Sequence, residues 1–119
     1  MLLDYLSTYP NTKIRYTKSD IILHLDSDAA NLVAPKARSR VAGYFYCGRK
    51  YNKNIPPSTN LNSPIHIECK TLKHVVALAA EAETAGLFHN CQTTVYIRNM
   101  LTVLSHLQPA TSRPFIFIN

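Results

Sequence analysis

The chain of 119 residues contains no apolar run of 18 residues or more, so the sequence predicts no membrane-spanning helix. Its first residues also lack a basic stretch followed by an apolar one, and we therefore expect no secretory signal there. Only three cysteines occur (Cys47, Cys69 and Cys91), and they are widely spaced without a CxxC pair. This argues against a disulfide framework and a zinc site, and favours an intracellular compartment, cytoplasmic or nuclear.

Glycine, histidine and acidic residues are too few or too scattered for several common kinds of site. Glycine occurs three times, which leaves no Gly-rich loop to hold a phosphate, and the five histidines do not cluster as zinc ligands would. The 7 acidic residues face 13 Lys and Arg, giving a formal net charge of +6. Such an excess is compatible with a polyanionic partner, although many basic domains bind no nucleic acid.

The whole chain is 46% hydrophobic and 17% charged, which indicates one globular α/β (α+β) domain with a modest core. Apolar periodicity predicts three strands, then a long helix from about Thr71 to Leu107, then one more strand. Thr71 is the expected N-cap, while Gly86 and the β-branched run at 93–95 leave open a division into two helices. The predicted strands are 21–31, 37–49, 65–70 and 115–118, with loops at 31–36 and 49–64.

Two of the predicted strands differ in how their faces are expected to pack. Residues 21–31 carry apolar side chains on both faces at first and then run into Asp26 and Asp28, which fits a central strand. Residues 65–70 alternate Ile65, Ile67 and Cys69 with polar residues, which predicts one buried face. A carboxylate at the end of a buried strand needs a partner, and a divalent metal, a basic side chain or solvent would each serve.

A second carboxylate, Glu83, lies within the predicted helix. Its neighbours one turn away are small or apolar, so the helix can approach the sheet closely there and bring the acid near a strand. Together Asp28 and Glu83 could bind one hard cation such as Mg²⁺, which prefers carboxylate oxygens. Taken alone, a glutamate at such a position is more often a boundary or salt-bridged residue.

The segments SDAANLVAPKARSRVAGYF and AAEAETAGLF resemble the ribonuclease H region of copia-type retrotransposon polyproteins. That family shows a Ser-Asp-Ala motif on its first strand, an Arg-Ser segment leading into Gly-Tyr on the second, and Glu-Ala-Glu on the helix. Residues 1–16 look like the end of the segment that connects the reverse transcriptase to this domain, and residues 17–119 like the domain itself. The resemblance implies a mixed sheet of the ribonuclease H type and Mg²⁺-dependent cleavage of RNA in RNA–DNA hybrids.

Carried over by position, the resemblance makes Asp28 and Glu83 the metal ligands and catalytic acids, and leaves Asp26 without a catalytic counterpart. The family's next strand usually ends in Asp-Asn, which supplies a third ligand, but this chain has Ile118 before Asn119. The fourth acid and the elements that carry it are also missing. We therefore expect an incomplete, C-terminally truncated domain in which the ancestral Mg²⁺ site is weak or absent and cleavage is impaired.

Three functions remain open at this point: an impaired nuclease, a module that binds hybrid or duplex without cleaving it, and a non-functional retroelement fragment. A nuclease completed by acids from a partner chain is a further alternative. The candidate phosphate contacts flank the predicted acid site, although a solvated charged face would have the same composition. These candidates are Arg38, Arg40, Lys70 and Lys73.

Overall fold

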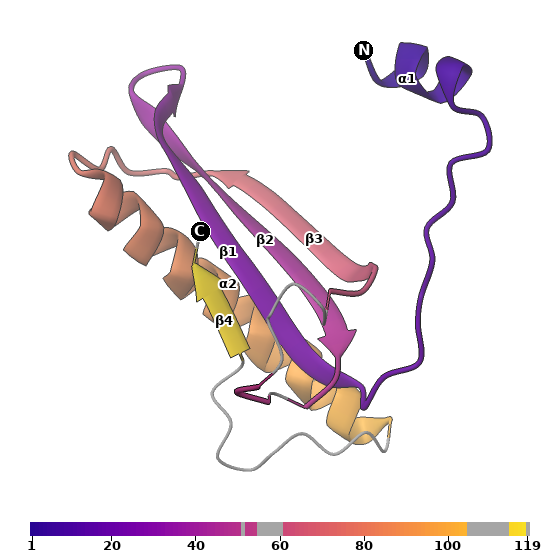
Figure 1. Ribbon diagram of the computed structural model, residues 1–119. Helices are drawn as coiled ribbons and strands as arrows, with labels where there is room; N and C mark the ends of the chain where they lie inside the picture. Colours follow the sequence, from indigo (N-terminus) through magenta and orange to yellow (C-terminus); the bar gives the residue numbers. More distant parts are fainter. Residues whose placement is uncertain (51, 55–60, 105–114, 119) are drawn as a thin grey trace.

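The computed structural model describes residues 1–50, 52–54, 61–104 and 115–118 (Figure 1). It contains the predicted succession of three strands, a long helix and a further strand, preceded by a short helix. Among the described residues, no helix is long and apolar enough to cross a membrane. The elements are α1 (Leu2–Thr8), β1 (Ile22–Ala34), β2 (Arg38–Gly48), β3 (Pro64–Thr71), α2 (Ala79–Val103) and β4 (Phe115–Ile118).

The four strands form one mixed sheet in the order β3-β2-β1-β4. β1 pairs antiparallel with β2, β2 pairs antiparallel with β3, and β4 pairs parallel with β1. β3 and β4 therefore run in the same direction, and parallel strands need a long crossover connection rather than a hairpin. α2 belongs to that crossover and lies across one face of the sheet (Figure 1).

The core lies between α2 and the two central strands. A hydrophobic cluster there combines Leu23 and Leu25 of β1 and Phe45 of β2 with Ile97 and Leu101 of α2. Leu25 and Phe45 are fully buried. Apolar burial of this kind supplies the main driving force for folding. The predicted central position of β1 is confirmed, because β1 lies between β2 and β4 in the sheet.

α2 is a single helix that begins later than predicted; residues 105–107, the end of the predicted helix, lie outside the described part of the chain. Thr71 ends β3, and the N-cap is Leu78. The carboxylate of Glu81 accepts hydrogen bonds from the backbone N–H groups of Ala77 and Leu78, at 3.0 and 3.4 Å. An acidic side chain in the first turn satisfies donors that the helix leaves open, and it interacts favourably with the helix dipole.

The sequence predicts a packed stripe through Val76, Ala79, Ala80, Glu83, Leu87, Asn90 and Cys91, extended by Ile97, Leu101 and Leu104. Asn90, Ile97 and Leu101 are buried as predicted, but the N-terminal part of the stripe is not. Ala79 and Ala80 are exposed, and Glu83 is half-buried at the margin. A side chain at position 86 would lie 2.8 Å from Val41 Cγ1, so the absence of one at Gly86 allows the close approach of helix and sheet. The buried residues are Ala82, Gly86, Asn90, Thr94, Ile97 and Leu101.

β1 extends further than predicted, because residues 31–34 belong to the strand rather than to a loop. Its pairing with β2 shifts register between Ala30 and Ala34. Ser39 stabilises this irregular end: its hydroxyl donates to Asn31 Oδ1 at 2.9 Å and accepts from the N–H of Leu32 at 3.1 Å. Polar side chains thus satisfy backbone groups that the ladder does not pair.

The N-terminal segment lies to one side of the sheet (Figure 1), and no residue of α1 is buried. It is attached near β3, where the hydroxyl of Tyr16 donates to the carbonyl of Pro64 at 2.8 Å. The N–H of Thr17 donates to Asn62 Oδ1 at 3.0 Å. The boundary between residues 16 and 17 stays a prediction.

Candidate functional site

Asp26 and Asp28 border a hollow of about 430 Å³ on the sheet face that α2 leaves uncovered. Tyr44, Leu61 and Ile67 also line it. Asp28 is exposed, and its Oδ1 accepts a hydrogen bond from the N–H of Ala29 at 2.9 Å. Burial raises the pKa of the half-buried Asp26, and the nearby charge of His24 opposes that shift.

The neighbours of Asp28 establish which face it occupies. Ser27 points to α2, where its hydroxyl accepts a hydrogen bond from Asn90 Nδ2 at 2.8 Å. On the same side, Ala29 Cβ lies 3.8 Å from the position that a Cβ at Gly86 would occupy. Successive side chains of a strand point to opposite faces. Asp28 therefore projects away from α2.

Glu83 is half-buried on α2 and lies on the other side of the sheet from Asp28. Helical periodicity separates it from Thr93, which reaches β3 on one flank of α2, and places it on the flank nearer β1. The structure thus does not bring Asp28 and Glu83 together on one face of the sheet. The two carboxylates could approach each other only around the edge of β1 after Ser27, the last residue of β1 with a described β4 partner.

The position expected to hold a third acid lies beside this same edge. β4 pairs with β1 up to Ile118, which is opposite Ser27 and hence one residue before the level of Asp28. The residue there is isoleucine. Among the residues that the structure describes, no three His, Cys, Asp or Glu side chains are grouped to hold a metal ion.

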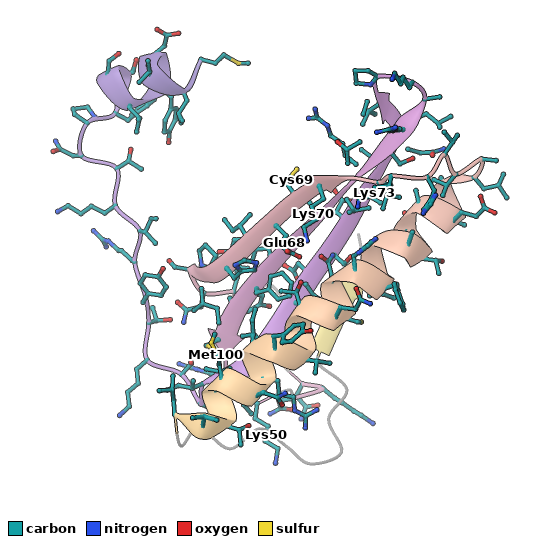
Figure 2. All side chains as sticks on the ribbon, turned by 180° about the vertical axis from the view of Figure 1, so that it is seen from behind. Lys50, Glu68, Cys69, Lys70, Lys73 and Met100 are labelled. Atoms are coloured by element: carbon teal, nitrogen blue, oxygen red, sulfur yellow. The ribbon has the colours of Figure 1, made fainter. Side chains whose placement is uncertain are left out.

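The four basic candidates divide between the two faces. Arg40 is exposed, and Arg38 two residues earlier is half-buried; both alternate with the fully buried Ser39 and so share the face of Asp28. Lys70 instead binds Glu68 on the α2 side, with Nζ 2.8 Å from Oε1. Lys73 follows β3 at the same end of the sheet as Lys70 (Figure 2). The candidates therefore form two separate pairs.

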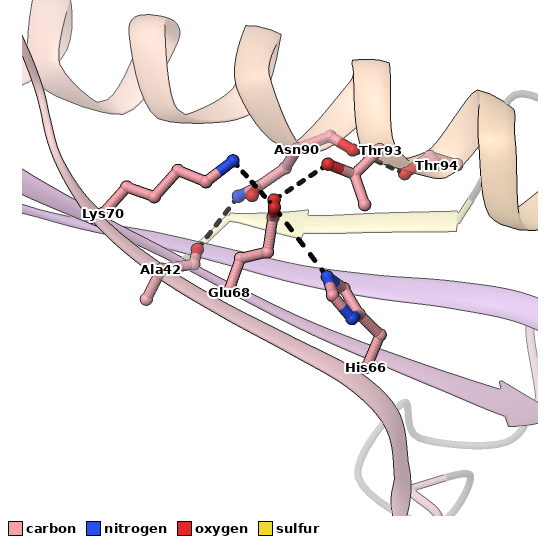
Figure 3. Close-up of polar contacts among 7 residues, drawn as sticks. All are labelled: Ala42, His66, Glu68, Lys70, Asn90, Thr93 and Thr94. Atoms are coloured by element: carbon pink, nitrogen blue, oxygen red, sulfur yellow. Dashed lines mark hydrogen bonds and ion pairs between the residues drawn. The ribbon is translucent and has the colours of Figure 1, made fainter.

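Glu68 is the centre of a polar cluster that the sequence did not reveal (Figure 3). Its side chain is 16% exposed and accepts hydrogen bonds from Lys70 and from the Thr93 hydroxyl, the latter at 2.8 Å. His66 Nε2 lies 3.8 Å from Oε1. Burial raises the pKa of Glu68, but the hydrogen bonds from Lys70 and Thr93 outweigh it, and the net shift is downward.

This cluster reverses the expected packing of β3. Glu68 faces α2, whereas Ile65 and Ile67 are 45% and 61% exposed. The prediction that the apolar set forms the buried face is therefore wrong. β3 lies at the edge of the sheet, and α2 packs mainly over β1 and β2, so polar side chains fill the margin beside the helix. The alternation itself was a correct signal for a strand.

Replacing Glu68 with glutamine is expected to lower the free energy of unfolding by about 1 kcal/mol at pH 7. The pKa of the Glu68 carboxyl is lower in the folded state, so its charge contributes stability at a pH above its pKa in the unfolded state. This stability is lost as the pH falls through its pKa in the folded state. The difference between wild type and variant should therefore shrink below about pH 4.5. Urea unfolding between pH 3 and 7 measures it, and a difference independent of pH would contradict the role of the charge.

Comparisons with protein-family models, curated proteins and solved structures found no match for this chain. Functional inference therefore depends on the positions of the side chains and on the strand order.

Proposed function

We propose that the chain is a ribonuclease H-like domain of retrotransposon origin that binds RNA–DNA hybrids and has lost most or all of its cleavage activity. The observation that carries the proposal is the path of the chain: three antiparallel strands, a helical crossover, and a fourth strand parallel to the first. Asp28 comes directly after the part of β1 that pairs with β4. The resemblance also implies a mixed sheet with an acid on its first strand, so this path of the chain supports the proposal.

The acids present do not fit a complete two-metal site. Mg²⁺ requires near-octahedral oxygen ligation, and two-metal hydrolysis needs acids that bridge ions about 4 Å apart. Asp28 projects from the sheet face opposite to α2, which carries Glu83. By the resemblance, Ile118 stands where the family has its third acid. A remnant Mg²⁺ site would depend on Asp28 and Glu83, and no cleavage step is assigned to these two acids.

Hybrid binding is supported by charge rather than by a shaped groove. The chain carries a net charge of +6, and Arg38 and Arg40 lie on the uncovered sheet face without an ion pair among the described residues. Guanidinium groups contact phosphates directly and release counterions as they do so. The binding is thus expected in the cytoplasm or nucleus, where nucleic acid is present.

The double variant Arg38→Gln/Arg40→Gln is expected to weaken hybrid binding by about tenfold at 50 mM salt and to reduce the salt slope by about 2. The expected loss follows from removal of two phosphate contacts. Fluorescence anisotropy with a labelled hybrid at several salt concentrations measures both quantities. Lys53→Gln, in an exposed loop, is the control and should change them little. An unchanged slope in the double variant would remove these arginines from the interface.

Incubation with a labelled hybrid and Mg²⁺ or Mn²⁺ tests the proposed loss of activity. We expect binding without cleavage, and no difference between wild type and Asp28→Asn, because that carboxylate has no complete set of partner acids. Cleavage that Asp28→Asn abolishes would show that the chain is an active nuclease. If the chain neither binds nor cleaves the hybrid, the proposed function is overturned and the chain is a non-functional fragment.

A further inference from the structure

One hollow lies between the end of β3 and α2, away from the Asp28 face, and a second adjoins it on the surface of α2. The first has a volume of about 290 Å³ and contains the two lysines of the region, Lys70 and Lys73. The second opens beside Phe88. Both hollows are bordered by Ala85 and His89, so that a single ligand can extend from one into the other.

The first hollow combines positive charge with an apolar wall. The charge of Lys70 is offset by Glu68 at 2.8 Å, whereas Lys73 has no ion pair within the described residues. His74 lies beside Lys73 and adds hydrogen-bond capacity. The wall includes Leu72, which is 6% exposed. These features suit a ligand that has an anionic group attached to a less polar body.

The second hollow offers a flat aromatic surface. Phe88 is 63% exposed, and its ring is 6.1 Å from that of His89 in an edge-on arrangement. The one carboxylate that borders this hollow, Glu81, already accepts hydrogen bonds from two backbone N–H groups. An exposed aromatic ring close to a cationic pocket is the combination on which proteins stack an unpaired nucleobase.

We propose that the two hollows together bind one nucleotide, with its phosphate at Lys73 and its base against Phe88. The inference rests on the proposed function in one respect, since Lys73 is also a candidate contact for nucleic-acid phosphate. It adds a separate site for a single unpaired nucleotide. That nucleotide is either a free nucleoside monophosphate or the phosphorylated end of a strand.

Calorimetric titration of the full chain with adenosine monophosphate, adenosine and inorganic phosphate tests the site. The monophosphate should bind more tightly than either of its parts. Lys73→Gln and Phe88→Ala should each weaken its binding by about tenfold. Lys50→Gln and Tyr96→Ala are matched controls and should leave binding unchanged, because Lys50 follows β2 at the opposite end of the sheet (Figure 2) and Tyr96 is an exposed aromatic residue of α2.

Binding of hybrids with and without a 5′-phosphate separates the two sources of the nucleotide. A terminal nucleotide is the ligand if phosphorylation strengthens binding and Phe88→Ala removes that gain; a free nucleotide is the ligand if only the monophosphate responds to the variant. The inference is overturned if Phe88→Ala and Lys73→Gln affect neither ligand. If Phe88→Ala still binds hybrids in a salt-dependent way, the proposed function stands. If the wild type binds the monophosphate but no hybrid, only the proposed function is overturned.

Discussion

Replacing Asn90 with leucine is expected to lower the free energy of unfolding by about 3 kcal/mol, because the buried amide joins α2 to both central strands. Asn90 is 1% exposed, and its Nδ2 donates to Ser27 Oγ at 2.8 Å. The same nitrogen donates to the carbonyl of Ala42 at 2.9 Å (Figure 3). Leucine has a similar volume but no donor, so it leaves two buried acceptors without this partner. Each such loss costs about 1–3 kcal/mol.

Urea unfolding followed by circular dichroism measures the effect, with Asn99→Leu as the matched control. Asn99 lies on the same helix but is exposed, so its replacement should change stability by less than about 0.5 kcal/mol. Adding Ser27→Ala to Asn90→Leu should cost less than the sum of the single changes, since the alanine removes one of the acceptors left unpaired. Equal losses for the Asn90 and Asn99 variants would show that the amide does not join helix to sheet.

The order of the elements could be predicted because strands and helices leave different periodicities in the sequence. Residues 21–31 and 65–70 alternate with a period of two, and the region after Thr71 does not. The parallel pairing of β1 and β4 could not be predicted from periodicity, since it depends on the crossover. Only the resemblance implied a mixed sheet.

The packed face of α2 was harder to predict because apolar residues occur all around this helix. Phe88, Tyr96 and Met100 are 63%, 74% and 61% exposed, whereas Gly86 and Asn90 are buried. Close approach of the helix to the sheet selects the smallest side chain and a hydrogen-bonding amide for the contact, not the largest hydrophobic residues. A search for a stripe at helical spacing therefore finds Asn90, Ile97 and Leu101 but misses Ala82, Gly86 and Thr94.

The residues of the candidate site come from the resemblance, whereas their arrangement depends on how the elements pack. Asp28 and Glu83 were identified through the resemblance, yet the face that each occupies depends on strand pleating and on the rotation of α2. A shift of one residue in the strand would exchange its two faces, and a shift of one residue in the helix would rotate its side chains by about 100°. Glu68 was missed for the same reason: its proximity to Thr93 exists only once α2 has been placed against the sheet.

Replacing Gly43 with alanine is expected to destabilise the fold by about 2–3 kcal/mol, although alanine fits the extended backbone of a strand. An added Cβ would lie 2.5 Å from Asn90 Oδ1 and 2.9 Å from Phe45 Cε2, closer than atoms can approach without movement. The amide cannot turn away without losing its hydrogen bonds to β1 and β2, and Phe45 is fully buried. The methyl group must therefore displace the helix or distort the core.

Thermal and urea unfolding of Gly43→Ala, Asn90→Ala and the double variant test this explanation. Asn90→Ala removes the amide oxygen that the new methyl group would meet, so the double variant should be more stable than the sum of the two single losses predicts. The gain is expected to be about 1 kcal/mol, with the contact to Phe45 accounting for the cost that remains. Strict additivity would mean that Gly43 and Asn90 do not share a contact, and that the close approach of α2 to β2 has another cause.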